Sequence, residues 1–110
     1  MTYGPGKGKD AGMIIVTGSI EARADTVDAL VALSLEHVRR SRAEPGCLAH
    51  AVHRDVEQPL RLVFVEEWTD AAALAAHFAV PASRDFVQRA AVLATSPPTI
   101  RVYEATAVRV

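Results

Sequence analysis

The order of strand-like and helix-like hydrophobic patterns is the feature that most constrains the fold of this chain. Residues 13–20 form a β-branched run, apolar at both parities, which is too short for a stable helix and predicts a buried strand. Residues 47–54 and 60–68 alternate with the period of two that is typical of strands. A last apolar segment over 99–105 follows two prolines and predicts a fourth strand.

Two segments between these strands have helical spacing. Apolar residues recur every three or four positions over 26–42, where Asp25 is expected to cap the helix and Pro45 to follow its end. A second helical pattern runs from about residue 70 to residue 94, and Pro81 predicts a break within it because proline favours a new helix start. The predicted order is therefore β-α-β-β-α-β.

This order, with a hairpin over 55–59 between the middle strands, predicts an α+β fold of the ferredoxin-like type with an antiparallel sheet. Two helical segments cover only one face of a four-stranded sheet, yet the first three strands carry apolar residues on both faces. An exposed apolar face of that size is unusual in a monomer. We therefore expect a homodimer in which the second face meets a second copy of the chain.

Composition narrows the possible partners and location. Residues 1–12 hold four of the six glycines and predict a disordered tail, so residues 13–110 form the one expected domain. Twelve basic against thirteen acidic residues argue against nucleic acid and against a membrane surface as partners. A single cysteine, Cys47, gives no internal disulfide, and no apolar run is long enough to span a membrane. A cytoplasmic location is expected.

A set of short motifs resembles the antibiotic biosynthesis monooxygenase family over about residues 13–106. They are Glu44-Pro45-Gly46 before the second strand, and Glu66-x-Trp68 followed nine residues later by His77. The resemblance implies a dimeric α+β barrel. It also implies an enzyme that oxidises a quinol or anthrone-type aromatic substrate with dioxygen and needs no cofactor, neither metal nor flavin.

Three residues are predicted to be catalytic. The resemblance places Trp68 in the cavity, as a flat wall for an aromatic substrate, whereas a plain core position is the alternative. His77, as a neutral imidazole, would accept a phenolic proton, although a purely hydrogen-bonding role is equally compatible with its position. Glu66 points inward on its strand and must be paired or protonated there, for example by an ion pair with Arg101.

Five further residues are expected to contact the substrate. Phe64, Phe78 and Phe86 would supply apolar contacts. His50 and His53 lie three apart on a strand and so on opposite faces, which allows at most one of them to enter the cavity.

The histidines do not predict a metal site. His50 and His53 would point apart, and no carboxylate lies at a helical spacing of four from His77.

Two departures from the family pattern keep other functions open: Phe64 and Leu74 stand where some anthrone oxygenases have asparagine and tyrosine. One alternative is a dimer that binds a small hydrophobic ligand and catalyses no reaction. The other is an isomerase or cyclase on the same fold.

Overall fold

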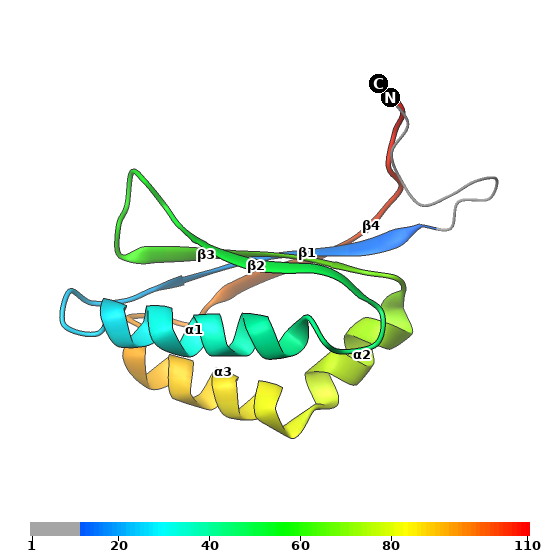
Figure 1. Ribbon diagram of the computed structural model, residues 1–110. Coiled ribbons are helices and arrows are strands. Elements are labelled where there is room, and N and C mark those ends of the chain that lie inside the picture. Colours follow the sequence, from blue (N-terminus) through cyan, green and yellow to red (C-terminus); the bar gives the residue numbers. More distant parts are fainter. Residues whose placement is uncertain (1–11) are drawn as a thin grey trace.

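The computed structural model describes residues 12–110, so the disordered tail predicted over 1–12 lies outside the described residues except for Gly12. A four-stranded antiparallel sheet has the strand order β2-β3-β1-β4, and three helices cover one of its faces (Figure 1). This is the predicted ferredoxin-like α+β fold. The elements are β1 (Met13–Glu21), α1 (Val27–Ser41), β2 (Cys47–Arg54), β3 (Arg61–Trp68), α2 (Ala71–Ala79), α3 (Pro81–Leu93) and β4 (Thr99–Ala105).

The helix ends follow local chemistry, with one correction. Asp25 was expected to cap α1, but the cap is Thr26, whose hydroxyl accepts from the amide of Arg23 and donates to the carbonyl of Leu93 at 2.7 Å. That second bond ties the start of α1 to the end of α3. Asp70 caps α2 by accepting from an amide at 2.8 Å, and the predicted break at Pro81 separates α2 from α3.

A β-bulge near the start of β2 changes which side chains face the helices. Cys47 pairs with Trp68, whereas Ala49 pairs with the preceding residue of β3, so one residue of β2 is extra. Strict alternation of residues 47–54 would put Cys47 and His50 on opposite faces, but the bulge places both on the helix-facing side. Leu48, which strict alternation would place on the face of His50, sits in the bulge and is 52% exposed.

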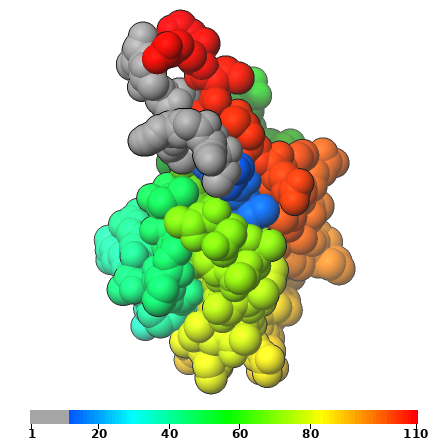
Figure 2. Space-filling model, turned by 90° about the vertical axis from the view of Figure 1, so that its right-hand side faces the viewer, coloured from blue at the N-terminus to red at the C-terminus, as the bar shows by residue number. Residues whose placement is uncertain are grey.

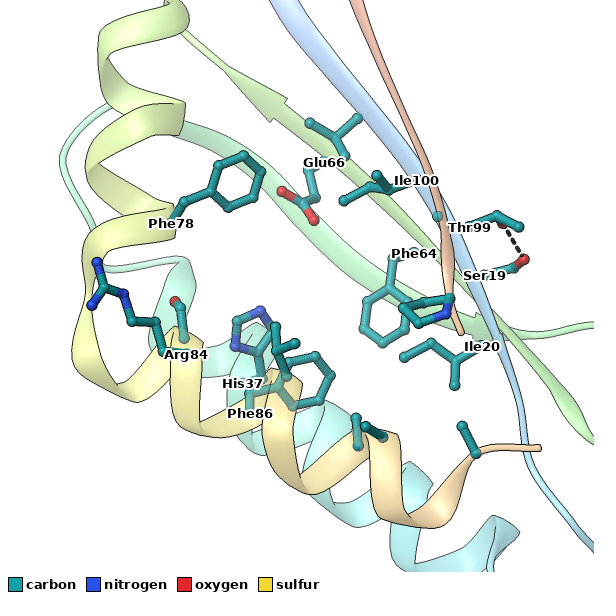
Figure 3. A pocket seen from close by; sticks show the side chains of 18 of the residues that line it. Ser19, Ile20, His37, Phe64, Glu66, Phe78, Arg84, Phe86, Thr99 and Ile100 are labelled. Atoms are coloured by element: carbon teal, nitrogen blue, oxygen red, sulfur yellow. Dashed lines mark hydrogen bonds between the residues drawn. The ribbon is translucent and has the colours of Figure 1, made fainter. Parts of the chain in front are cut away.

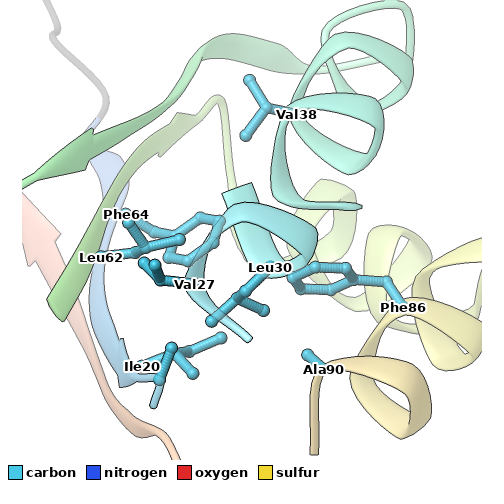
Figure 4. Close-up of a cluster of buried hydrophobic side chains, with 9 residues drawn as sticks. Ile20, Val27, Leu30, Val38, Leu62, Phe64, Phe86 and Ala90 are labelled. Carbon is cyan, nitrogen blue, oxygen red and sulfur yellow. The ribbon is translucent and has the colours of Figure 1, made fainter. Parts of the chain in front are cut away.

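The core fills the space between the sheet and the helices. Phe64 of β3, Leu30 of α1 and Phe86 of α3 meet in the larger of two clusters (Figure 4). The smaller cluster surrounds Trp68, which is fully buried. Both clusters lie on the helix side, so they hold the helices at a fixed distance above the sheet.

No helix of residues 12–110 covers the other sheet face (Figure 1), and that face carries apolar side chains. Ile15 pairs with Tyr103 on one side, and Thr17 pairs with Val65 on the other. Val65 and Tyr103 remain 36% and 46% exposed. This is the uncovered face that the sequence predicts. Among residues 12–110, no helix combines the length and the hydropathy that a membrane crossing requires.

Candidate functional site

A cavity of about 520 Å³ lies between the sheet and the helices α2 and α3 (Figure 3). Figure 2 shows the molecule from the side on which α2 and α3, in yellow-green and yellow, lie next to β4, in orange. Phe64, Phe78 and Phe86 form aromatic parts of its wall. Its polar side chains are few, and they come from α1, β1, β3, α2, α3 and β4: Ser19, His37, Glu66, His77, Ser83, Arg84, Gln88 and Thr99. Such a mainly apolar cavity with a few polar groups is the usual form of a small-molecule site.

The turn before β2 brings a carboxylate to His77. Gly46 has φ +83°, and a Cβ there would approach the Cβ of Ala73 to 2.5 Å, so only glycine fits this close approach to α2. Two residues earlier, Oε1 of Glu44 lies 2.8 Å from Nδ1 of His77. A carboxylate only accepts hydrogen bonds, so Nδ1 carries the proton, and in the neutral ring Nε2 keeps its lone pair. Glu44 therefore fixes His77 as a hydrogen-bond acceptor.

His37 on α1 is the opposite tautomer, with its proton on Nε2. Its Nδ1 lies 2.8 Å from a terminal nitrogen of Arg40, which only donates, so Nδ1 accepts and the proton of the neutral ring is on Nε2. The ring stacks on Phe86 with 4.1 Å between centres. Burial, followed by the neighbouring His50, His77 and Arg40, lowers the pKa of His37 to about 3. At neutral pH His37 is therefore an uncharged hydrogen-bond donor in the cavity wall.

Glu66 is buried, and its partners differ from the one expected. Nε1 of Trp68 donates to Oε1 of Glu66 at 2.9 Å, and Nε2 of His50 lies 3.3 Å from Oε2. Burial raises the pKa of Glu66, and the hydrogen bond from Trp68 offsets part of that rise. The suggested ion pair with Arg101 is wrong, because Arg101 is exposed and pairs across the strands with Thr17, on the uncovered face.

His50 lies behind the cavity wall with its side chain fully buried. Neither ring nitrogen makes a hydrogen bond, and the nearest acceptor is Oε2 of Glu66, at 3.3 Å from Nε2. Burial, then the neighbouring His77 and Arg42, lowers the pKa of His50 to about 4. One nitrogen each of His37, His50 and His77 lies within 4.8 Å of the others. The sequence argument against a metal site did not include His37, which completes this cluster.

The structure thus places the predicted residues in three groups. Most of them line the cavity: Phe64, Glu66, His77, Phe78 and Phe86. Trp68 and His50 are buried next to His77, with ring centres 4.6 and 5.5 Å from it, and contribute no lining. His53 is exposed at the end of β2, away from this cavity. The alternation of β2 had left open which of the two histidines faces the helices, and His50 does.

Sequence reasoning missed His37 and Glu44. The signal for His37 was its place in the buried stripe of α1, three residues after Ser34 and beside Val38. Glu44 stood inside the motif before β2, but nothing in the sequence alone pairs it with a histidine 33 residues later.

A sequence model of the antibiotic biosynthesis monooxygenase family matches residues 13–89. An uncharacterized Synechocystis protein is 34% identical over 91 residues, which are 83% of this chain and 62% of that protein. The chain thus spans less than two thirds of this curated relative.

Solved structures of similar proteins share the fold. A candidate antibiotic biosynthesis monooxygenase from Deinococcus radiodurans superposes with a TM-score of 0.84 at 28% identity, over 88% of this chain and 97% of that one. A Mycobacterium tuberculosis protein gives a TM-score of 0.78 at 25% identity, over 83% of this chain and 92% of that one.

Proposed function

Since this chain belongs to the antibiotic biosynthesis monooxygenase family, we propose that it oxidises a small aromatic quinol or anthrone-type substrate with dioxygen, without metal or flavin. The observation that carries the proposal is the Glu44–His77 pair, whose free imidazole nitrogen belongs to a side chain lining an apolar cavity. An oriented neutral imidazole is the usual general base for a phenolic or enolic proton.

The cavity suits a flat apolar molecule. Its volume of about 520 Å³ is within the usual range for small-ligand sites, about 300–1,000 Å³. The rings of Phe64 and Phe86 are 6.0 Å apart at 63°, and both border it (Figure 3). Ser83 has a buried hydroxyl without a hydrogen-bond partner on the same wall, which a polar substituent of the substrate would satisfy.

His37 and His77 together suit one substrate oxygen. A nitrogen of each ring lies within 4.8 Å of the other, so one oxygen at about 2.8 Å reaches both. In this pose the substrate hydroxyl donates to His77 and its oxygen accepts from His37. Once the proton moves to His77, the new oxyanion keeps the hydrogen bond from His37, which lowers the barrier to its formation.

The reaction balances without a further reductant. For an anthrone, R₂CH₂ + O₂ gives R₂C=O + H₂O. His77 takes the first proton, the electron-rich anion gives its electrons to dioxygen, and a C–O bond forms as a peroxide, which takes that proton back from His77 to become a hydroperoxide. His77 then removes the second C–H proton, the C=O bond forms and the O–O bond breaks. The leaving hydroxide takes this second proton from His77 and departs as water.

We also propose that two chains form a homodimer through the uncovered sheet face. Support comes from Val65 and Tyr103, large side chains that remain partly exposed on that face. Burying such a face against a second copy removes apolar surface from water, at about 25 cal/mol for each Å².

Oxygen uptake by the metal-stripped protein with a panel of quinols and anthrones tests the function. We expect uptake above autoxidation that falls at least a hundredfold in His77→Ala, because general-base catalysis contributes about 10²–10⁴-fold. Turnover that continues without oxygen would instead support the isomerase or cyclase. Binding of the panel without turnover would support the ligand-binding dimer.

A further inference from the structure

Three buried histidines from three different elements face one another at the cavity wall, two of them lining the cavity and His50 lying behind it. His37 comes from α1, His50 from β2 and His77 from α2. Their ring centres form a nearly equilateral triangle with sides of 5.3, 5.4 and 5.5 Å. One nitrogen of each ring lies within 4.8 Å of the other two.

This triangle is close to the arrangement of three imidazoles on one metal ion. Zn–N bonds of about 2.0–2.1 Å at the tetrahedral angle separate the nitrogens by about 3.4 Å and the ring centres by about 5 Å. The ring centres thus need almost no movement, and rotation of the rings brings the nitrogens closer. We propose that His37, His50 and His77 form a binding site for one divalent first-row transition cation, of which zinc is the expected occupant.

His50 gives independent support. Its side chain is fully buried, yet both ring nitrogens lack a hydrogen bond. A buried polar group without a partner costs about 1–3 kcal/mol, so such groups call for an explanation. A cation on one nitrogen satisfies that nitrogen. The Glu66 carboxyl group, 3.3 Å from Nε2 of His50, places a further oxygen beside the site.

His77 already has the outer partner that metal-binding histidines usually have. Its Nδ1 donates to Glu44 at 2.8 Å, which leaves Nε2 as the ligand atom. A carboxylate on the far nitrogen fixes the tautomer and increases the basicity of a ligating histidine.

Arg40 competes with the cation. A ring that binds a cation through one nitrogen carries hydrogen on the other, so His37 cannot at the same time accept the hydrogen bond from Arg40 at 2.8 Å. Binding therefore requires the guanidinium to leave His37. Arg40→Met removes both the competing donor and its charge, and we expect it to tighten cation binding about tenfold or more.

The cation would also control the proposed reaction. It occupies the lone pair of His77, so the base is lost and oxidation stops. This consequence rests on the proposed function, whereas cation binding itself does not. Zinc is thus expected to inhibit oxygen uptake and to bind equally well when no substrate turns over.

The test uses the untagged, metal-stripped full chain and two readouts that need no activity. Calorimetry with Zn²⁺ is expected to show one site per chain with a Kd at or below micromolar. Co²⁺ is expected to give visible absorption of tetrahedral intensity and to quench Trp68, whose ring centre lies 4.6 Å from that of His77. Zn²⁺ should reverse the quenching.

Substitutions locate the site. His37→Gln and His50→Gln are expected to weaken Zn²⁺ binding at least tenfold, while His53→Gln, which changes an exposed histidine of the same strand, leaves it unchanged. Absence of saturable Zn²⁺ binding at about 100 μM, or binding that His53→Gln abolishes, would overturn the proposal. Co²⁺ quenching of Trp68 in the unsubstituted chain decides the matter if a histidine variant does not fold, and its absence then counts against the site.

Discussion

Nε1 of Trp68 donates a hydrogen bond of 2.9 Å to Oε1 of Glu66, two residues earlier on the same face of β3. The tryptophan therefore holds the carboxyl group that borders the cavity, while its own ring packs against His77. The Glu-x-Trp spacing has a physical reason: residues two apart on a strand share a face.

Trp68→Phe keeps a large ring and deletes the donor. The buried carboxyl of Glu66 then lacks its partner, and we expect the free energy of unfolding to fall by about 1–3 kcal/mol from the lost bond, plus the smaller loss of apolar area. Urea unfolding followed by circular dichroism measures the change, because Trp68 is the only tryptophan. If the losses in Trp68→Phe and Glu66→Gln simply add in the double variant, the two side chains are not coupled.

Glu44→Gln tests the orientation of His77. An amide can donate as well as accept, so it no longer fixes the proton on Nδ1, and we expect kcat for the proposed oxidation to fall about 10–100-fold. Glu44→Asp should recover part of that loss. The matched control is Glu36→Gln, an exposed carboxylate on α1, which should leave kcat unchanged. Equal kcat in Glu44→Gln and the unsubstituted protein would remove Glu44 from the reaction.

The Trp68–Glu66 pair could be predicted in part from the sequence, whereas the Glu44–His77 pair could not. The element order and the inward direction of Glu66 follow from local periodicity, which needs only neighbouring residues. The Glu44–His77 pair depends on the close approach at Gly46, and the side chain of His50 faces the helices together with Cys47 only because of the β-bulge. Both are tertiary features that a period of two or 3.6 does not encode. The histidine cluster could not be predicted because its members come from three elements.

Stability is expected to fall as the pH decreases below neutral. The folded-state pKa values of His50 and His37, about 4 and about 3, lie below the ordinary value of 6.5. Below pH 6.5 the unfolded chain therefore binds protons that the folded chain does not, and stability is lost down to the folded pKa values. The slope is on the order of 1 kcal/mol per pH unit for each histidine. Glu66, with its raised pKa, acts in the opposite direction.

Thermal or urea unfolding between pH 7 and pH 4.5, with a chelator present, measures this slope. His50→Gln is expected to lower it, because one of the two buried histidines is gone. His53→Gln is the control and should leave the slope unchanged, since its side chain lies outside the buried cluster. A slope that is the same in all three proteins would mean that other groups cause the acid sensitivity.

Two phenylalanines of the cavity wall should separate binding from stability. Phe86 is 8% exposed and belongs to the core, so Phe86→Ala is expected to cost about 3–5 kcal/mol. Phe78 is 46% exposed, so Phe78→Ala should change stability much less while it raises KM for an aromatic substrate. Urea unfolding and substrate titration give the two values. A KM unchanged in Phe78→Ala would place the substrate elsewhere in the cavity.

Val65→Glu is expected to disrupt the proposed homodimer. Val65 lies on the uncovered face of β3, one of the two central strands. In the dimer a carboxylate at this position would be buried in the interface without a partner of opposite charge. Val56→Glu is the matched control, because Val56 is 93% exposed between β2 and β3. Sedimentation at micromolar concentration should show a dimer for the unsubstituted chain and for Val56→Glu, and a monomer for Val65→Glu. A folded monomer of the unsubstituted chain would mean that the apolar sheet face is tolerated in water, and a dimer of Val65→Glu would place the interface on another surface.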